Sequence, residues 1–435
     1  MSEPRVLVVG QGGREHALLD ALHASPEHPH LYVAPGNPAM ETLAERVPIS
    51  VTDVPQLVAW CRSHPVDLVV AGSEAPLERG LADELSAAGI PCLGPTQEAA
   101  RLETSKRHAK EILRRLGLPT AAFRIAESAD DADRLVNGAA YPLVLKADGL
   151  AAGKGVVIAR TQAEAKATID AWMRRGGLGT AAQTLIVEEC LEGEEASILV
   201  LTDGERWMLF PPARDHKRIG DGDTGPNTGG MGAVAPARVP GEAEALAIAT
   251  SIVDPLLRSL RESGTPYRGI LYLGLMLTGS GPMVLEINAR FGDPEAQVVL
   301  PTASEDLYPL FLAAARGALP PERHGTFIAH AGAAVCVVLA TRGYPEHPEM
   351  GDAIEGLDGA WPHGVRAYAA GVDRRGAKWV TSGGRVLGIT ARAETVERAR
   401  AAAYAALKRI RFDGMHYRRD IAVLPQPSGV RADER

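Results

Sequence analysis

The chain has 435 residues, of which 46% are apolar and 23% are charged, and it carries a formal net charge of −8. This length exceeds what one hydrophobic core normally supports, so we expect several domains of ordinary globular composition. The negative charge and the aromatic content of only 5% argue against binding to nucleic acid or to an anionic membrane surface. No apolar run approaches the roughly 20 residues that cross a bilayer, so no membrane segment is expected.

The cysteines and the N-terminal sequence favour a reducing compartment. The four cysteines form no CxxC pair, and Cys336 lies in the apolar run AAVCVVLA, which is typical of buried free thiols. The first residues, MSEPRVLVVG, lead into a predicted strand without the apolar core of a signal peptide. We therefore expect a cytoplasmic protein.

Residues 1–103 alternate short apolar runs with helical patterns. Strands are predicted at 5–10, 30–36 and 66–72, and helices at 14–25 and 54–64. Such alternation predicts a parallel sheet with helices wound on both faces. We assign this section to an N-terminal domain.

Two further sections follow, at 104–320 and 321–435, with Pro320 and Pro321 at their boundary. A helix at 104–120 is predicted to be capped by Thr104 or Ser105. Strands are predicted at 142–148, 155–159, 184–191, 196–210, 269–278 and 282–288, with a Gly-Ser-Gly hairpin between the last two. The third section opens with a strand at 333–340 and ends with an amphipathic helix at 395–410.

The loop VVGQGGREHA, at 8–17, follows a strand and opens a helix, where backbone N–H groups favour an anion. Glu15 replaces the third glycine of the dinucleotide fingerprint, and the next strand ends in PGN without an acidic residue, so a nicotinamide cofactor is disfavoured. One interpretation is a phosphate or phosphosugar at Gly10, Gly12 and Gly13. The other is a tight strand-to-helix turn.

The run LVLKADGLAAGKGVVIA, at 143–159, places Lys146 at a strand end and Lys154 in a glycine loop. It is not a Walker motif, because no Ser or Thr follows the Gly-Lys pair and a strand comes next. Such a loop can cover triphosphate oxygens as a flap while its lysines neutralise them. The alternative is a plain hairpin.

The run VEECLEGEEAS, at 187–197, carries a weaker signal. Backbone groups at a strand end can bond the edge of an adenine, and Glu188 or Glu195 can accept a hydrogen bond from a ribose hydroxyl. Acidic residues at a strand end are more often simply solvated.

The run MVLEINARFGDPE, at 283–295, carries a candidate metal site. Glu286 and Asn288 are two residues apart on a predicted strand, so both side chains point to one face. A carboxylate and an amide oxygen that face phosphates suit Mg²⁺, which takes few protein ligands. Arg290 continues the alternation and would offer its fork of donors to a substrate carboxylate or phosphate.

The stretch RDHKRIGDGDTGPNTGGMG, at 214–232, has only two apolar side chains, those of Ile219 and Met231. Such a run cannot bury enough apolar surface to offset the entropy of ordering its backbone. It is therefore either a flexible linker or a loop that is ordered by something it binds.

Together these motifs resemble the ATP-grasp enzymes and, more narrowly, the phosphoribosylamine–glycine ligase family. The likeness extends from VLVVGQGGREHAL (6–18) to FDGMHYRRDI (412–421), nearly the whole chain, and 214–232 is among its most specific parts. It also covers APGNP, GSEAPLERGL, KADGLAAGKGV, EINARFGDPE and TSGGRVLG. The resemblance implies an α/β fold with an N-terminal doubly wound parallel-sheet domain, a central ATP-grasp domain of two subdomains with a flap at about 120–192, and a C-terminal α+β domain.

The resemblance also implies a reaction. ATP phosphorylates the carboxylate of glycine, and the amine of 5-phosphoribosylamine displaces the phosphate, giving glycinamide ribonucleotide, ADP and phosphate in de novo purine biosynthesis. The implied cofactors are ATP and Mg²⁺ or Mn²⁺. The implied partners are these small molecules, and the chain would be a monomer or a weak homo-oligomer.

The resemblance implies site residues as well. It places ATP on Lys106, Lys146, Gly153, Lys154, Gly155, Glu188, Glu189, Leu191 and Glu195. It places the substrates on Gly10, Gly12, Gly13, Gly36, Asn37, Glu74, Asp215 and Arg290. Lys146, Asp215, Lys217 and Arg290 would act in catalysis, Glu286 and Asn288 would hold the metal, and 214–232 would close over the substrates.

The sequence departs from the family pattern at two places, and three other kinds of function are alternatives to this one. The run LYLGLML, at 271–277, offers no third acidic metal ligand, and Ser73 stands where a proline is usual. A carboxylase or another carboxylate–amine ligase would share the ATP and metal motifs, although a biotin-acceptor lysine motif is absent from the sequence. The other rivals are a nicotinamide-dependent dehydrogenase and a non-catalytic nucleotide sensor.

Overall fold

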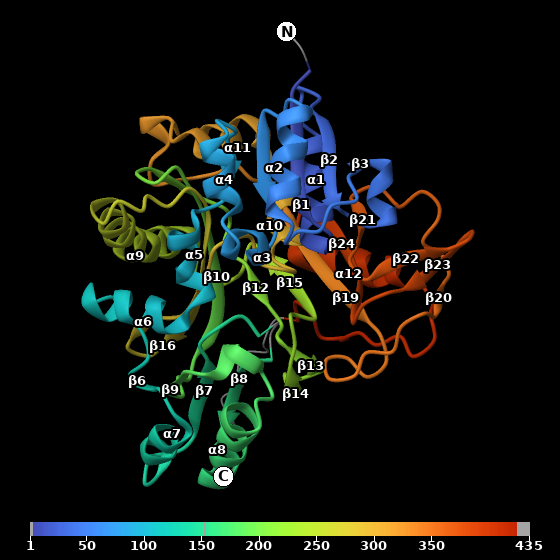
Figure 1. The fold of residues 1–435 in the computed structure, drawn as a ribbon. Coiled ribbons are helices and arrows are strands. Elements are labelled where there is room, and N and C mark those ends of the chain that lie inside the picture. The colour runs from blue at the N-terminus through green and yellow to red at the C-terminus, as the bar shows by residue number, and fades with distance from the viewer. Residues whose placement is uncertain (1–2, 152–153, 424–435) are drawn as a thin grey trace, which may run out of the picture.

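The computed structural model describes residues 3–151 and 154–423. Its N-terminal section (blue in Figure 1) is a five-stranded parallel sheet in the order β3-β2-β1-β4-β5. The strands are β1 (Arg5–Gly10), β2 (His30–Pro35), β3 (Glu45–Arg46), β4 (Leu68–Ala71) and β5 (Cys92–Leu93). The helices are α1 (Gly13–His23), α2 (Val54–Ser63), α3 (Glu74–Glu78) and α4 (Leu81–Ala87). The doubly wound sheet predicted from the alternating pattern is thus confirmed.

Helices α5 (Gln97–Thr104) and α6 (Lys106–Arg115) lead from this sheet to the central section. Ser105 separates them, and its hydroxyl accepts a hydrogen bond from the backbone N–H of His108 at 3.1 Å. This contact satisfies a donor that the first turn of a helix leaves unpaired. Of the two predicted caps, Ser105 is therefore the one that the structure uses.

A four-stranded antiparallel sheet in the order β6-β9-β7-β8 forms the first part of the central section. It comprises β6 (Phe123–Ala126), β7 (Leu143–Ala147), β8 (Val156–Ala159) and β9 (Leu185–Glu189), with α7 (Ala129–Val136) and α8 (Gln162–Ile169) packed against it. This unit has a small apolar core of its own and lies at the lower end of the molecule in Figure 1. The loop between β7 and β8 is the predicted flap.

The second central sheet has the order β17-β16-β10-β11-β18. Its strands are β10 (Glu194–Thr202), β11 (Trp207–Leu209), β16 (Gly269–Thr278), β17 (Gly281–Asn288) and β18 (Thr326–Phe327). Alternate side chains of β16 face opposite sides: Leu271 and Leu273 pack with the helix α9 (Glu242–Glu262), and Ile270 and Tyr272 pack with α10 (Ala296–Thr302) and α11 (Leu307–Arg316). The predicted hairpin between β16 and β17 is present. Within the part of the chain that the structure describes, no helix is both long and apolar enough to cross a membrane.

The C-terminal section contains a sheet in the order β12-β15-β19-β24-β21. Its strands are β12 (Arg214–Asp215), β15 (Gly232–Ala235), β19 (Ala333–Ala340), β21 (Val365–Ala369) and β24 (Arg385–Ala393). Beside it lie the small sheet β20 (Ala353–Ile354), β23 (Lys378–Thr381), β22 (Val372–Arg375) and the helix α12 (Val396–Leu407). Two strands of this sheet, β12 and β15, come from before Pro320, so the central and C-terminal sections interlock instead of following one another as separate units.

The glycine-rich stretch at 214–232 is folded. Between β12 and β15 it forms a two-stranded hairpin of β13 (Arg218–Gly220) and β14 (Thr224–Asn227). Its backbone and side chains bond to the C-terminal section, for example through Gly222 N–H to Asp420 at 2.8 Å. A flexible linker would not make such contacts.

The cysteines are free thiols, as the spacing predicts. Cys61, Cys92 and Cys336 are buried, and Cys190 is half-buried. Burial raises the pKa of each of the three buried thiols to about 12, so they stay protonated and unreactive at neutral pH.

Leu273→Ala is expected to destabilise the fold. Leu273 has no exposed surface between β16 and α9, and truncation in such a site costs about 2–5 kcal/mol through lost burial and the remaining cavity. Met350→Ala is the control, because 60% of Met350 is exposed and its loss should change stability by less than about 0.5 kcal/mol. Urea unfolding midpoints measure both, and equal midpoints would contradict this packing.

Candidate functional site

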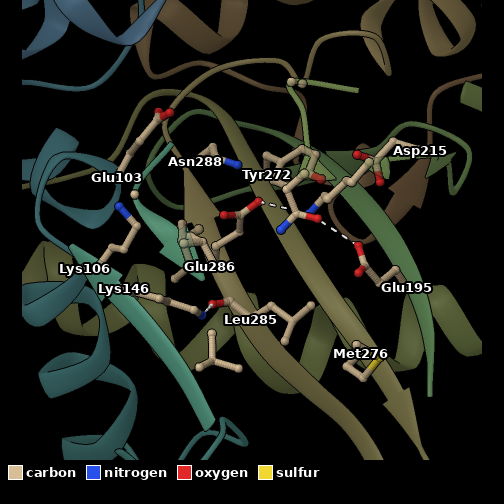
Figure 2. Close-up of a pocket in the computed structure, with 18 of the residues that line it drawn as sticks. Glu103, Lys106, Lys146, Glu195, Asp215, Tyr272, Met276, Leu285, Glu286 and Asn288 are labelled. Atoms are coloured by element: carbon tan, nitrogen blue, oxygen red, sulfur yellow. Dashed lines mark hydrogen bonds and ion pairs between the residues drawn. The ribbon is translucent and has the colours of Figure 1, made fainter. Parts of the chain in front are cut away.

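A cavity of about 690 Å³ lies where the central sheets meet the N-terminal and C-terminal sections. Figure 2 shows Glu286 and Asn288 projecting into it, with Lys106 and Lys146 on one side and Glu195 and Asp215 on the other. Charged groups of both signs line it. Since a buried charge is costly unless it is paired, the contacts among these groups stabilise their charges within the cavity.

Glu188, near the end of β9, lies between two lysines at the floor of the cavity. Its carboxylate contacts Lys146 Nζ at 2.9 Å and Lys110 Nζ at 3.0 Å, and only 2% of the residue is exposed. Burial lowers the pKa of Lys110 to about 8. Lys146 also donates to the carbonyl oxygen of Leu285 at 2.9 Å. Glu188 therefore orients the two lysines, and this arrangement leaves it poorly placed for the ribose contact that was one of its predicted roles.

Lys106 opens α6 on the same side of the cavity as Lys146 (Figure 2). Its ammonium group contacts the carbonyl oxygen of Gly149 at 3.4 Å, at the base of the flap loop. Burial lowers its pKa. The structure thus brings together two of the lysines that were predicted to bind phosphate.

The flap loop contributes backbone and small side chains to the cavity. Ala151 and Gly155 line it, whereas Lys154 is exposed and lies outside the lining. Gly153 lies outside the described residues. A contact between Lys154 and ATP would therefore require this loop to move.

The segment that follows Glu188 forms one wall of the cavity. Glu189 accepts a hydrogen bond from the backbone N–H of Ala122 at 2.8 Å, so its carboxylate holds the start of β6. Leu191 and Met276 give this part of the wall an apolar surface. Apolar surface beside strand-end backbone groups suits a purine ring, as was predicted for this segment.

Glu286 is paired with a lysine from the glycine-rich stretch. Lys217 Nζ lies 3.4 Å from Glu286 Oε1 and 3.4 Å from Glu195 Oε2. Lys217 is the main reason that the pKa of Glu286 falls to about 2. Burial opposes the charge of Lys217, but Glu286, Glu195 and Asp215 together hold its pKa well above the usual range. The structure therefore places the predicted ribose acid, the predicted metal ligand and a predicted catalytic lysine in one contact.

The donor set on β17 fits a divalent cation. Glu286 is ionised, Asn288 offers an amide oxygen two residues further on, and both line the same cavity. The ammonium group of Lys217 already neutralises Glu286, which shows that a cation is stabilised at this position. Among the described residues, no cluster of three or more His, Cys, Asp or Glu side chains with metal-ligating geometry occurs.

Arg290 lies two residues after the end of β17, and its side chain lines the cavity. Because β17 ends at Asn288, the prediction that Arg290 continues the strand alternation is wrong, although its guanidinium group lines the same cavity. It contacts Glu103 Oε1 at 2.7 Å and Glu74 Oε2 at 3.2 Å. Burial raises the pKa of Glu103 to about 7, although Arg290 opposes this effect. At Glu74 burial also acts to raise the pKa, but Arg290 and Arg14 outweigh it and lower the pKa to about 2. Two carboxylates thus share one guanidinium, and Glu103 is the one that takes up a proton.

Asp215 ends β12 beside a second group of polar side chains. Burial raises its pKa, Lys217 opposes this effect and Glu295 adds to it. Tyr272 donates its hydroxyl proton to Glu295 Oε1 at 2.8 Å, and its oxygen lies 2.9 Å from the Ser197 hydroxyl. Lys217 is the only cation among these five residues, so this end of the cavity suits a positively charged ligand group.

The glycine loop at 10–13 lies outside the lining of the cavity. The N–H of Gly12 donates to Glu15 Oε2 at 2.6 Å, so the residue that replaces the third fingerprint glycine takes a backbone donor for itself. A Cβ at Gly13 would lie 2.7 Å from Gln297 Nε2, and Gly10 has a φ of +151°. These glycines meet the needs of the tight turn, which was one of the two interpretations, and a phosphate at this loop stays a prediction.

Gly36 and Asn37 also lie outside the lining. Gly36 has a φ of +62°, a conformation that favours glycine. The Asn37 amide donates to the carbonyl oxygens of Gln11 at 2.9 Å and Ala369 at 3.1 Å, so it ties the N-terminal section to β21. The phosphoribosyl group was predicted to bind the loops at 10–16, 35–37 and 72–77, and of these loops Arg14 and Glu74 line this cavity.

Several lining residues were not predicted as site residues: Glu103, Lys110, Glu295 and Arg385. Lys110 could have been found, because it follows Lys106 by four residues and so shares a helix face with it. Arg385 lies in the run TSGGRVLG, which was singled out without a role. No local pattern distinguishes Glu103, because only the tertiary fold brings it against Arg290.

Glu103→Gln is expected to change how stability depends on pH. Between the usual pKa of 4.5 and the folded value of about 7, the folded protein keeps a proton on Glu103 that the unfolded chain releases. Raising the pH through this interval therefore favours unfolding of the wild type, and the variant lacks this titration. The stability of the wild type relative to Glu103→Gln should fall between pH 5 and pH 8. A constant difference would contradict this assignment, and Glu98→Gln, in an exposed pair with Arg101 on the same helix, is the control.

Three sequence families match the chain in succession. They are described as the N domain, the ATP-grasp (A) domain and the C domain of phosphoribosylglycinamide synthetase, and they match residues 4–103, 104–296 and 334–424. Their order agrees with the three-section architecture of the structure.

Curated relatives align over nearly the full chain. The phosphoribosylamine–glycine ligase of Caulobacter vibrioides is 45% identical over 97% of this chain and 98% of its own length. That of Phenylobacterium zucineum is 46% identical over 96% of this chain and 98% of its own length. The trifunctional purine biosynthetic protein adenosine-3 of Gallus gallus is 44% identical over 98% of this chain, which corresponds to 43% of that longer protein.

Solved structures agree with this relationship. The phosphoribosylamine–glycine ligase of Thermotoga maritima superposes with a TM-score of 0.82 at 34% identity, covering 96% of this chain and 100% of that one. The biotin carboxylase domain of Hydrogenobacter thermophilus 2-oxoglutarate carboxylase has a TM-score of 0.73 at 16% identity over 95% of this chain and 91% of that one, which shows a shared fold alone. The chain belongs to the phosphoribosylglycinamide synthetase family.

Proposed function

We propose that the protein uses ATP to join glycine to 5-phosphoribosylamine, giving glycinamide ribonucleotide, ADP and phosphate. The observation that carries this proposal is the meeting of three groups in one cavity: the lysines Lys106 and Lys146, the Glu286–Asn288 pair, and the guanidinium of Arg290. Relatives aligned over 97% of the chain bear the name phosphoribosylamine–glycine ligase, which supports the choice of substrates.

The ATP would lie between the two central sheets. Lys106 and Lys146 would neutralise its phosphates, the backbone of the flap loop would cover them, and the apolar wall at Leu191 would receive the adenine. Glu195 would be released from Lys217 to bond the ribose. Divalent metal, Mg²⁺ or Mn²⁺, would be held by Glu286 and Asn288, and when bound it would neutralise charge that develops on the phosphate oxygens.

The glycine would lie between Arg290 and Asp215. Arg290 would orient the glycine carboxylate after exchanging one of its two carboxylate partners for the substrate, and the carboxylates around Asp215 would receive the ammonium group. The carboxylate oxygen attacks the γ-phosphorus of ATP, and ADP leaves. Lys217 is placed to stabilise the charge on the transferred phosphoryl group, because its ammonium group lies at Glu286.

The second step joins the two substrates. The neutral amine of 5-phosphoribosylamine attacks the carbonyl carbon of glycyl phosphate, phosphate leaves, and the amine nitrogen loses a proton. Glu74 and Arg14 line the N-terminal side of the cavity, where the phosphoribosyl group would enter. Gly10, Gly12, Gly13, Gly36 and Asn37 lie further along this side and stay candidates for its phosphate. The hairpin at 214–232 would exclude water from the acyl phosphate.

A carboxylase is the second candidate, because biotin carboxylases share the fold. That likeness at 16% identity supports the fold and no particular substrate. The carboxylates of Asp215, Glu195 and Glu295 in this part of the cavity favour a substrate with an ammonium group, an amino acid, over bicarbonate. No observation favours a nicotinamide cofactor, since Glu15 occupies the fingerprint turn.

We also propose the wider setting of the enzyme. It would act in the cytoplasm as a monomer or weak homo-oligomer, with small-molecule substrates as its partners. The net charge of −8 supports the absence of a nucleic-acid partner. The section 1–103 would bind the phosphoribosyl group, and the section 104–320 would bind ATP. The section 321–435 would support the hairpin, and it shares the strands β12 and β15 with the central section.

The activity is tested by phosphate release from ATP in the presence of glycine and freshly prepared 5-phosphoribosylamine. Release should require both substrates and should not occur when bicarbonate replaces glycine. Lys146→Met should lower kcat about 100-fold or more, because it removes a cation aimed at the phosphates. Lys166→Met, on the exposed face of α8, is the matched control and should retain activity. Phosphate release that depends on bicarbonate and ignores glycine would favour the carboxylase.

The metal assignment is tested by nucleotide binding. Mg²⁺ should tighten the binding of a non-hydrolysable ATP analogue to the wild type, and Glu286→Gln should reduce this effect about tenfold, because the amide carries no charge. Glu244→Gln, exposed on α9, is the control. Calorimetry with and without EDTA measures both. An unchanged Mg²⁺ effect in Glu286→Gln would place the ion on other groups.

A further inference from the structure

The C-terminal run FDGMHYRRDI, at 412–421, has no place in the cavity described above. Its buried charged residue is Arg418, whose side chain is only 1% exposed and does not line the cavity. An arginine removed from water to this extent needs partners for all of its donors. Those partners lie on the glycine-rich hairpin and on the run itself.

Arg418 binds the hairpin at two residues, Arg218 and Asp223, that themselves line the cavity. Its NH1 nitrogen donates to Asp223 Oδ1 at 2.6 Å and to the carbonyl oxygen of Arg218 at 3.1 Å. Its Nε and NH2 nitrogens donate to the two carboxylate oxygens of Asp420 at 2.8 and 2.7 Å. A planar guanidinium can satisfy this set of acceptors, which a lysine ammonium cannot match in geometry.

Other bonds join the same two segments. Asp420 accepts from the N–H of Gly222 at 2.8 Å, and Asp221 accepts from the N–H of Arg419 at 2.7 Å. His416 Nε2 lies 2.8 Å from the carbonyl oxygen of Ile219. The hairpin is therefore held by residues 416–420 of its own chain.

The 416–422 segment is itself anchored on the rigid part of the C-terminal section. Arg400 of α12 donates to the carbonyl oxygens of Ile421 at 2.9 Å and Arg419 at 2.7 Å. Tyr404 of the same helix donates to the carbonyl oxygen of Arg418 at 2.8 Å. The support thus runs from α12 through this segment to the hairpin.

The clamp acts next to a residue of the cavity. The carbonyl that Arg418 binds belongs to Arg218, whose neighbour Lys217 contacts Glu286 and Glu195. Thr228, on the returning side of the hairpin, donates its N–H and its hydroxyl to the carbonyl oxygen of Lys217, both at 2.8 Å. The position of the Lys217 ammonium group therefore depends on a hairpin that Arg418 holds.

We propose that Arg418 is a positioning residue that sets Lys217 in the cavity, so that the C-terminal segment controls phosphoryl transfer from outside the site. This inference rests on the proposed function. Without the clamp the hairpin keeps few apolar contacts of its own, and the ammonium group of Lys217 is displaced. A displacement of about 1 Å can slow a reaction about 100-fold.

The test compares Arg418→Met with the wild type in the ligation assay. Arg418→Met should lower kcat by about ten- to a hundredfold, while KM for ATP changes less than about threefold, because Lys106, Lys146 and the adenine wall do not depend on the hairpin. Arg418→Lys should recover part of the rate. Arg409→Met, which removes an arginine bonded to the carbonyl oxygen of Ala360 elsewhere in the section, is the control and should keep full activity.

A double-mutant cycle separates positioning from a general structural role. If Arg418 acts through Lys217, then Arg418→Met should cost less than about threefold in the Lys217→Met background. A full loss in that background, or a parallel rise in KM for ATP, would overturn the proposal. Should Arg418→Met fail to fold, Asp420→Asn carries the test, because Asp420 binds both Arg418 and Gly222 and does not line the cavity: it should lower kcat several-fold, and an unchanged kcat would overturn the proposal. A wild type without glycine-dependent phosphate release would instead refute the proposed function.

Discussion

The contact of Lys217 with Glu286 and Glu195, at 3.4 Å to each, is the interaction on which the arrangement of the site depends. Lys217 neutralises these two carboxylates, which would otherwise repel each other in the cavity. Arg290 plays the same part for Glu74 and Glu103, and Glu188 does so for Lys110 and Lys146. A ligand group that binds one of these charged side chains must replace an existing ion pair, so such binding requires specific side chains to rearrange.

These charges meet because the cavity lies between sections that share their cores. One apolar cluster runs from the N-terminal sheet to β16 and α9, and a second runs from α1 through α10 and α11 to the C-terminal sheet. The β6–β9 unit has a separate core, so the flap is the part of the site with the fewest apolar ties to the rest. The elements that carry the charged residues of the cavity are thus held by the two shared apolar clusters. The flap loop is held by the separate core of the β6–β9 unit.

The hairpin at 214–232 obtains its order differently. Its sequence has almost no apolar side chains, and hydrogen bonds to 416–420 take the place of a core. Asp215 and Lys217 directly precede its strand β13, and the carbonyl oxygen of Lys217 accepts hydrogen bonds from Thr228 on its returning side. Hydrogen bonds are directional, and a hairpin built on them has one defined position instead of a loose ensemble.

The sequence by itself determined the parallel N-terminal sheet, the β16–β17 hairpin and the joint placement of Glu286 and Asn288, because these follow from local periodicity and turn chemistry. The tertiary structure alone decided that Glu103 faces Arg290, that Glu188 holds two lysines and that Arg418 clamps the hairpin. It also showed that Arg290 lies beyond its strand and that Lys154 points to solvent. The reason is physical: strand and helix periods act over a few residues, whereas ion pairs join groups as far apart in the chain as positions 103 and 290.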